Sequence, residues 1–142
     1  MARGYGMFGK KKQDRKRAGL QTALLQVQAA RARDAVRARD LIVGTGPETT
    51  DESLWSAMEL FLGIAREVPS VRTSLVQQAA AAPPNAQVAF ASALAVIDSG
   101  NSSAFQGGNP EGQLRLMMTL PAIVAQDAAG SRLFDEMVAR YS

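Results

Sequence analysis

The chain contains neither cysteine nor histidine. The lack of cysteine excludes disulfide bonds, thiol nucleophiles and cysteine-ligated metal sites. The lack of histidine removes the commonest general base and the commonest ligand of transition metals. The sequence also has no Gly-x-Ser-x-Gly motif and no glycine loop with the Lys-Ser/Thr ending of a phosphate-binding loop. We therefore expect a protein that is not an enzyme, with no catalytic residues, no metal site and no cofactor.

Long apolar runs are also lacking. The best of them, Leu116–Ala125, is ten residues long and includes Thr119 and Pro121, whereas a transmembrane helix needs about 20 apolar residues. The residues that follow the basic run Lys10–Arg17 are too polar for the apolar region of a secretory signal. We expect a protein that is neither secreted nor transmembrane, located in the cytoplasm or within a virion or nucleoprotein assembly.

Aromatic residues are few: five Phe, two Tyr and one Trp. Because the remaining apolar residues are largely alanine, the core has to come from close packing of helices around a few large side chains. No stretch of four to eight residues alternates apolar and polar residues in the manner of a strand. The sequence predicts an all-α fold, a small bundle of five to seven helices with a long first helix.

The long first helix is predicted over Leu20–Val43, and Gly44 is a candidate for its C-terminal cap. Within it, the four-residue unit Arg-Ala-Arg-Asp occurs at positions 31–34 and again at 37–40. Carboxylates and guanidinium groups spaced three residues apart can pair on a helix surface, so we expect Arg31 and Arg37 to be partly neutralised by Asp34 and Asp40. The apolar positions of this helix fall largely on a spacing of three to four residues: Leu24, Leu25, Ala29, Ala32, Val36 and Val43.

Residues 50–141 are predicted to form the rest of the bundle. The clearest helical stripe runs from Leu54 to Val68, and Pro69 follows it. Asn109 followed by Pro110 is a strong helix start, and we expect that helix to kink or break near Pro121.

Charge is divided sharply along the chain. Residues 1–40 carry eleven Lys or Arg against three Asp, a net charge of +8, whereas residues 41–142 carry five Arg against ten Asp or Glu, a net charge of −5. Residues 1–18 are basic, contain Gly4, Gly6 and Gly9, and hold too little apolar surface to fold alone. We predict a disordered basic arm over residues 1–18 and a single helical domain over residues 19–142.

A flexible cluster of cations fits a polyanion. We predict a binding protein whose arm contacts the nucleic-acid backbone with little sequence specificity, while the body binds protein partners or further copies of itself. An alternative is a structural or assembly subunit, virion- or mobile-element-associated, whose arm and first helix dock on an acidic protein surface without nucleic acid. A membrane is not expected as the partner, because stable anchoring needs a second signal besides charge. The predicted nucleic-acid-binding residues are Arg3, Lys10, Lys11, Lys12, Arg15, Lys16, Arg17, Arg33 and Arg37.

Overall fold

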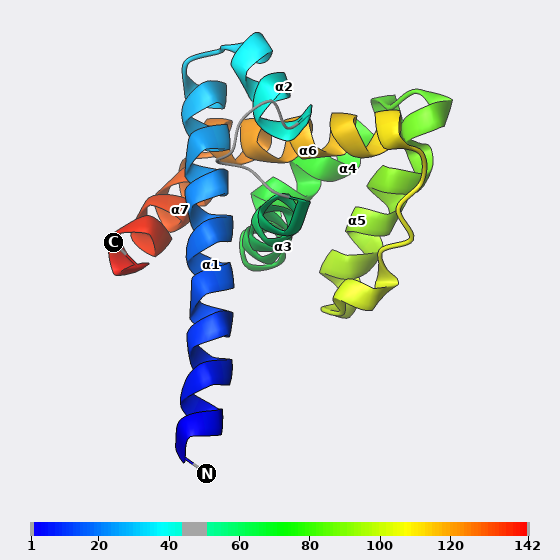
Figure 1. The fold of residues 1–142 in the computed structure, drawn as a ribbon. Helices are drawn as coiled ribbons and strands as arrows, with labels where there is room; N and C mark the ends of the chain where they lie inside the picture. The colour runs from blue at the N-terminus through cyan, green and yellow to red at the C-terminus, as the bar shows by residue number, and fades with distance from the viewer. Residues whose placement is uncertain (1, 44–50, 142) are drawn as a thin grey trace.

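A computed structural model describes the backbone of residues 2–43 and 51–141 and the side chains from Asp14 onward within those ranges. In these ranges the chain is helical, without a strand, which confirms the all-α prediction (Figure 1). The α-helices are α1 (Ala2–Arg31), α2 (Ala35–Val43), α3 (Asp51–Glu67), α4 (Pro69–Ala81), α5 (Gln87–Ser99), α6 (Pro110–Gln126) and α7 (Ala128–Tyr141), and two short 3-10 turns, η1 (Pro84–Ala86) and η2 (Ser102–Ala104), flank α5.

The core lies where α3 and α6 are covered by the other helices. Phe61 of α3 and Phe134 of α7 are fully buried and stack with their ring centroids 6.2 Å apart. Phe90 of α5 is buried in the same cluster. The predicted stripe of α3 is buried as its period requires, since Leu54, Met58, Phe61, Leu62 and Ala65 all face inward.

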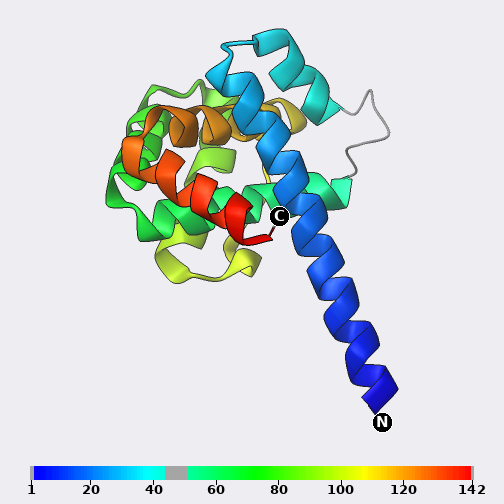
Figure 2. The same ribbon diagram turned by 90° about the vertical axis from the view of Figure 1, so that its left-hand side faces the viewer.

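Only the C-terminal half of α1 belongs to this core. Leu20, Ala23 and Val27 are buried against the body, mainly against α3 and α6, whereas residues 14–18 are exposed. Figures 1 and 2 show the N-terminal half of α1 extending past the body. A helix that packs against nothing depends on its own propensity, which Gly4, Gly6 and Gly9 lower. The extended helix is therefore compatible with an arm that is disordered without a partner.

The prediction of one helix over Leu20–Val43 was wrong, because the chain turns at residues 32–34. The N–H of Asp34 donates to the carbonyl of Ala29 at 2.9 Å, and that of Arg33 donates to the carbonyl of Ala30 at 3.1 Å. Together with the left-handed φ of 56° at Arg33, these bonds form a Schellman end, which glycine usually makes. Asp34 then caps α2 by accepting the N–H of Arg37 at 3.0 Å.

This turn changes which residues are buried. Because α2 leaves the axis of α1, Val36 and Val43 are 73% and 51% exposed, whereas the predicted stripe would have buried them.

Further along the chain, Asn109 caps α6 as predicted, its side chain accepting the N–H of Gly112 at 2.7 Å. The break expected near Pro121 is absent, since α6 continues through this buried residue to Gln126.

The junction between α6 and α7 is held by Asp127. Its Oδ1 accepts the N–H of Gly130 at 2.7 Å, in the manner of an N-cap. A hydrogen bond from the Ser70 hydroxyl, with those from the Gly130 and Ala129 N–H groups, lowers the pKa of Asp127 below its usual value. Gly130 fits closely here, because a Cβ at this position would lie 2.7 Å from Cγ2 of Val71 on α4.

Arg33→Gly should stabilise the protein by about 1 kcal/mol, since glycine adopts a left-handed φ without the steric cost that other residues meet. Chemical denaturation of the purified variant measures this change. The control is Ala30→Gly in the last turn of α1, which should lower stability by about 0.5–1 kcal/mol, as glycine does inside a helix. Equal destabilisation by both glycines would contradict the turn at Arg33.

Asp127→Ala should cost about 1 kcal/mol at neutral pH, the usual effect of losing a helix cap. A carboxyl group whose pKa is lower in the folded than in the unfolded protein stabilises the fold above its unfolded pKa, and this contribution is lost as pH falls through the folded pKa. The difference between wild type and variant should therefore shrink in strong acid, as urea denaturation at neutral pH and near pH 3 can measure. A difference that does not change with pH would argue against the charged cap.

Candidate nucleic-acid interface

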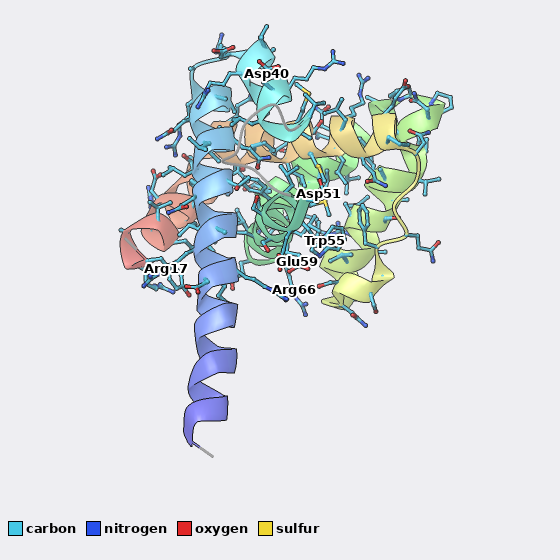
Figure 3. The ribbon with its side chains drawn as sticks, viewed as in Figure 1. Arg17, Asp40, Asp51, Trp55, Glu59 and Arg66 are labelled. Atoms are coloured by element: carbon cyan, nitrogen blue, oxygen red, sulfur yellow. The ribbon has the colours of Figure 1, made fainter. Side chains whose placement is uncertain are left out.

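Seven of the nine predicted cations lie on one stretch of α1. Arg15, Lys16 and Arg17 are exposed on the described part of the arm, and Figure 3 shows Arg17 at the place where α1 leaves the body. Arg3 and Lys10–Lys12 lie on the same helix nearer its N-terminus, where the side chains are outside the described set. As a helix, residues 2–17 would span about 24 Å at 1.5 Å per residue. The arm thus places a net charge of +6 on a short, projecting rod.

The base of the arm is fixed by a close approach of α1 to α3. A Cβ at Gly19 would lie 2.5 Å from Cβ of Ser56, so only glycine fits there without a shift. One turn earlier, Nε of Arg15 contacts Oε1 of Glu52 at 2.7 Å. Both partners are more than 60% exposed, and such surface pairs contribute at most about 1 kcal/mol. Arg15 can therefore exchange Glu52 for another anion at little cost.

Arg33 and Arg37 lie apart from the arm. Arg33 is in the turn after α1 and Arg37 is on α2, and both are exposed. At 1.5 Å per residue, the end of α1 lies about 21 Å along the helix axis from Arg17. The structure therefore divides the predicted cations into an arm cluster and a separate pair at the α1–α2 turn.

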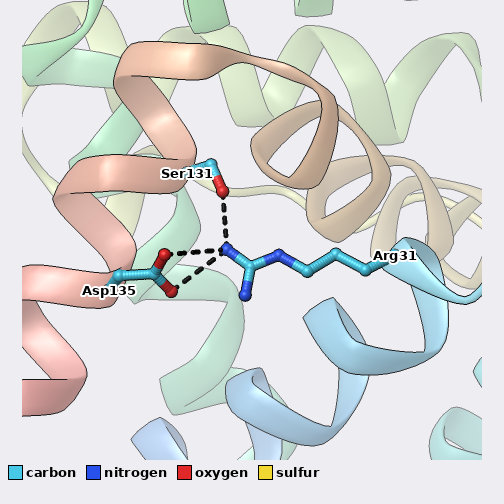
Figure 4. A network of polar contacts seen from close by, with 3 residues as sticks. All are labelled: Arg31, Ser131 and Asp135. Atoms are coloured by element: carbon cyan, nitrogen blue, oxygen red, sulfur yellow. Dashed lines mark hydrogen bonds and ion pairs between the residues drawn. The ribbon is translucent and has the colours of Figure 1, made fainter.

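The pairing expected between Arg31 and Asp34 in the Arg-Ala-Arg-Asp repeat is wrong, because both side chains have other partners. Nη2 of Arg31 donates to Oγ of Ser131 at 2.5 Å and to both carboxylate oxygens of Asp135 at 3.0 and 3.2 Å (Figure 4). Arg31 thus connects the end of α1 to α7 and is not paired with Asp34. The Asp34 carboxylate instead accepts the backbone N–H of Arg37. These partners could not be predicted, because the turn at Arg33 and the placement of α7 determine them.

Two arginines of the body, Arg66 and Arg72, contact other parts of the body. Arg72 and Asp98 form a two-pronged pair between α4 and α5, with N–O distances of 2.9 and 3.0 Å, and the hydrogen bond from Arg72 lowers the pKa of Asp98. The guanidinium of Arg66 lies over Gly100 at the C-terminal end of α5, where the helix dipole favours a cation. Positive charge is densest on the arm, with seven Lys or Arg in residues 2–17, while exposed arginines of the body such as Arg115, Arg132 and Arg140 are spread over α6 and α7.

A groove with a volume of about 540 Å³ opens at the base of the arm, bounded by α1, α3 and α7. We call it the arm-base groove. Trp55 and Tyr141 line it and are 36% and 46% exposed. No sequence pattern predicts this groove, because Trp55 flanks an ordinary apolar stripe and only the packing of three helices brings Trp55 and Tyr141 together. The full lining is Arg15, Lys16, Leu20, Glu52, Trp55, Ser56, Glu59, Leu60, Met137 and Tyr141.

Within the described residues, no three carboxylates gather closely enough to hold a metal ion. The helices of the described ranges include none that is both long and apolar enough to cross a membrane. No family model matches the chain, and comparisons with curated proteins and with solved structures likewise find no match.

Proposed function

We propose that this chain is a non-enzymatic nucleic-acid-binding protein. Its basic arm contacts the phosphate backbone with little sequence specificity, and its helical body contacts protein partners or further copies of the chain. The observation that carries the proposal is the charge of the arm. Residues 2–17 contain seven Lys or Arg against one Asp, and this segment extends past the body (Figure 2). A helix of cations that extends past the body can contact a phosphate backbone without rearranging the fold.

The pairing of charges supports assigning this role to the arm and not to the body. Arg31 and Arg72, whose side chains are 37% and 42% exposed, are paired with Asp135 and Asp98, so a phosphate would have to compete with a carboxylate there. In the described part of the arm, only Arg15 is in an ion pair with a described residue, and that pair is exposed. Backbone contacts carry no sequence information, which is why little specificity is expected.

Replacing Lys10, Lys11 and Lys12 by Gln should weaken binding to duplex DNA and flatten its salt dependence. The logarithm of the binding constant falls with the logarithm of the salt concentration at about 0.9 per neutralised phosphate, so losing three contacts should reduce the slope by about 2.7. Fluorescence anisotropy with a labelled duplex between about 50 and 200 mM salt gives both slopes.

The matched control removes the same charge from the body. Arg115, Arg132 and Arg140 are exposed and belong to α6 and α7, and changing all three to Gln should leave the slope unaltered. Equal losses from the two triple variants would show that net charge, and not the arm, determines affinity. If the wild-type chain bound no nucleic acid at low salt, the proposal would be wrong, and docking of the arm on an acidic protein surface would take its place.

A further inference from the structure

The arm-base groove has the chemistry to hold an unpaired nucleobase. Its lining is mainly apolar, with Leu20, Leu60 and Met137 beside the partly exposed rings of Trp55 and Tyr141. The Trp55 ring is held by an edge-on contact with Phe105, with ring centroids 5.2 Å apart, and keeps 36% of its surface exposed. Aromatic side chains that stay partly exposed in a groove offer planar surfaces on which bases stack, whatever their sequence. Its volume of about 540 Å³ accommodates flat rings, whereas a double helix would have to open before one of its bases could enter.

Charge around the groove determines which part of a nucleotide can enter. Arg15 and Lys16 line it from α1 and continue the cation cluster of the arm. Glu52 and Glu59 line it from α3 (Figure 3 shows Glu59 and Trp55 on this helix). Glu52 is paired with Arg15, while Glu59 is in no ion pair with a described residue. The Glu59 carboxylate repels phosphate from the interior, but its oxygens can accept hydrogen bonds from the N–H groups of a neutral base.

We propose that the arm-base groove stacks unpaired bases on Trp55 and Tyr141 while Arg15 and Lys16 hold the adjoining phosphates, so that the chain prefers single-stranded to double-stranded nucleic acid. This inference rests on the proposed function, since the arm delivers the strand to the groove. It adds the class of nucleic acid, which the arm alone does not select. Base stacking needs exposed base faces, and only a single strand or an opened duplex provides them.

Trp55 allows a direct test, because it is the only tryptophan of the chain. A strand of about twelve nucleotides would be added to the full-length protein, once alone and once annealed to its complement. The single strand should quench tryptophan emission and bind more tightly, whereas the duplex should bind through the arm and leave the emission unchanged. Equal affinity for both forms, with no quenching by either, would overturn the groove proposal and leave the arm proposal standing.

Variants of Tyr141 test the groove without disturbing the core, since this side chain is half exposed near the end of α7. Tyr141→Leu should weaken single-strand binding by about 5- to 150-fold, the usual range for loss of one stacked base, and Tyr141→Phe should restore most of it. Neither variant should change duplex binding. Val88→Ala, at another exposed apolar residue on α5, is the control and should bind like wild type.

The outcomes separate the two proposals. If Tyr141→Leu binds the single strand as tightly as Tyr141→Phe, stacking in the groove is refuted even when both forms of DNA bind the arm. If the Lys10–Lys12 variant loses duplex binding while the single strand still quenches Trp55, the groove acts as proposed. If neither form of DNA binds the wild type at low salt, the arm and groove proposals fall together.

Discussion

The arrangement of the whole molecule depends on the close approach of α1 to α3 at Gly19. Any larger residue would bring a Cβ to within 2.5 Å of Ser56, and the adjoining Leu20, Ala23 and Val27 are buried where α1 packs on α3 and α6. The contact divides one helix into a packed half and an exposed half. It thereby fixes the direction of the arm, and it places Arg15 and Lys16 at the edge of the groove that α3 and α7 complete.

The division of charge has a structural counterpart. The body is acidic overall, and its carboxylates hold its own arginines: Asp98 pairs with Arg72, and Asp135 pairs with Arg31 at the end of α1. These ion pairs neutralise two arginines with carboxylates of the body, and they link α1 to α7 and α4 to α5. Positive charge is densest on the arm, with seven Lys or Arg against one Asp in residues 2–17, and this is the layout that attracts a polyanion.

The sequence predicted helices well where the signal, an apolar period or a capping residue, lay within the helix itself. The apolar period of α3 gave its buried face, and Asn109 with Pro110 marked the start of α6, because both signals depend only on residues within a few turns. The end of α1 was missed because Arg33 occupies a position that glycine usually fills. Its steric cost is offset by the hydrogen bonds of the turn and by the cap that Asp34 provides for α2.

The candidate site could be predicted only in part. A run of cations is visible in the sequence itself, so the arm was identified by counting charges. The groove was not, because Trp55 and Tyr141 are 86 positions apart and their shared surface depends on how α1, α3 and α7 pack. The same holds for Arg31, whose partner on α7 is 104 residues away. The apolar period and the capping residues depend on residues that are close in the sequence. The groove and the Arg31 contact depend on tertiary packing between residues that are far apart in the sequence.

Amide hydrogen exchange, measured residue by residue with and without nucleic acid, would show whether α1 is anchored at one end and free to bind at the other. The structure predicts slow exchange from Leu20 to Ala30 in the free protein, where α1 is packed on the body. It predicts fast exchange in residues 2–17 that becomes slower when a strand is bound, because the partner orders the arm. Unchanged exchange in the arm on binding, with new protection confined to α4 or α5, would contradict the claim that the anchored helix presents its free end to nucleic acid.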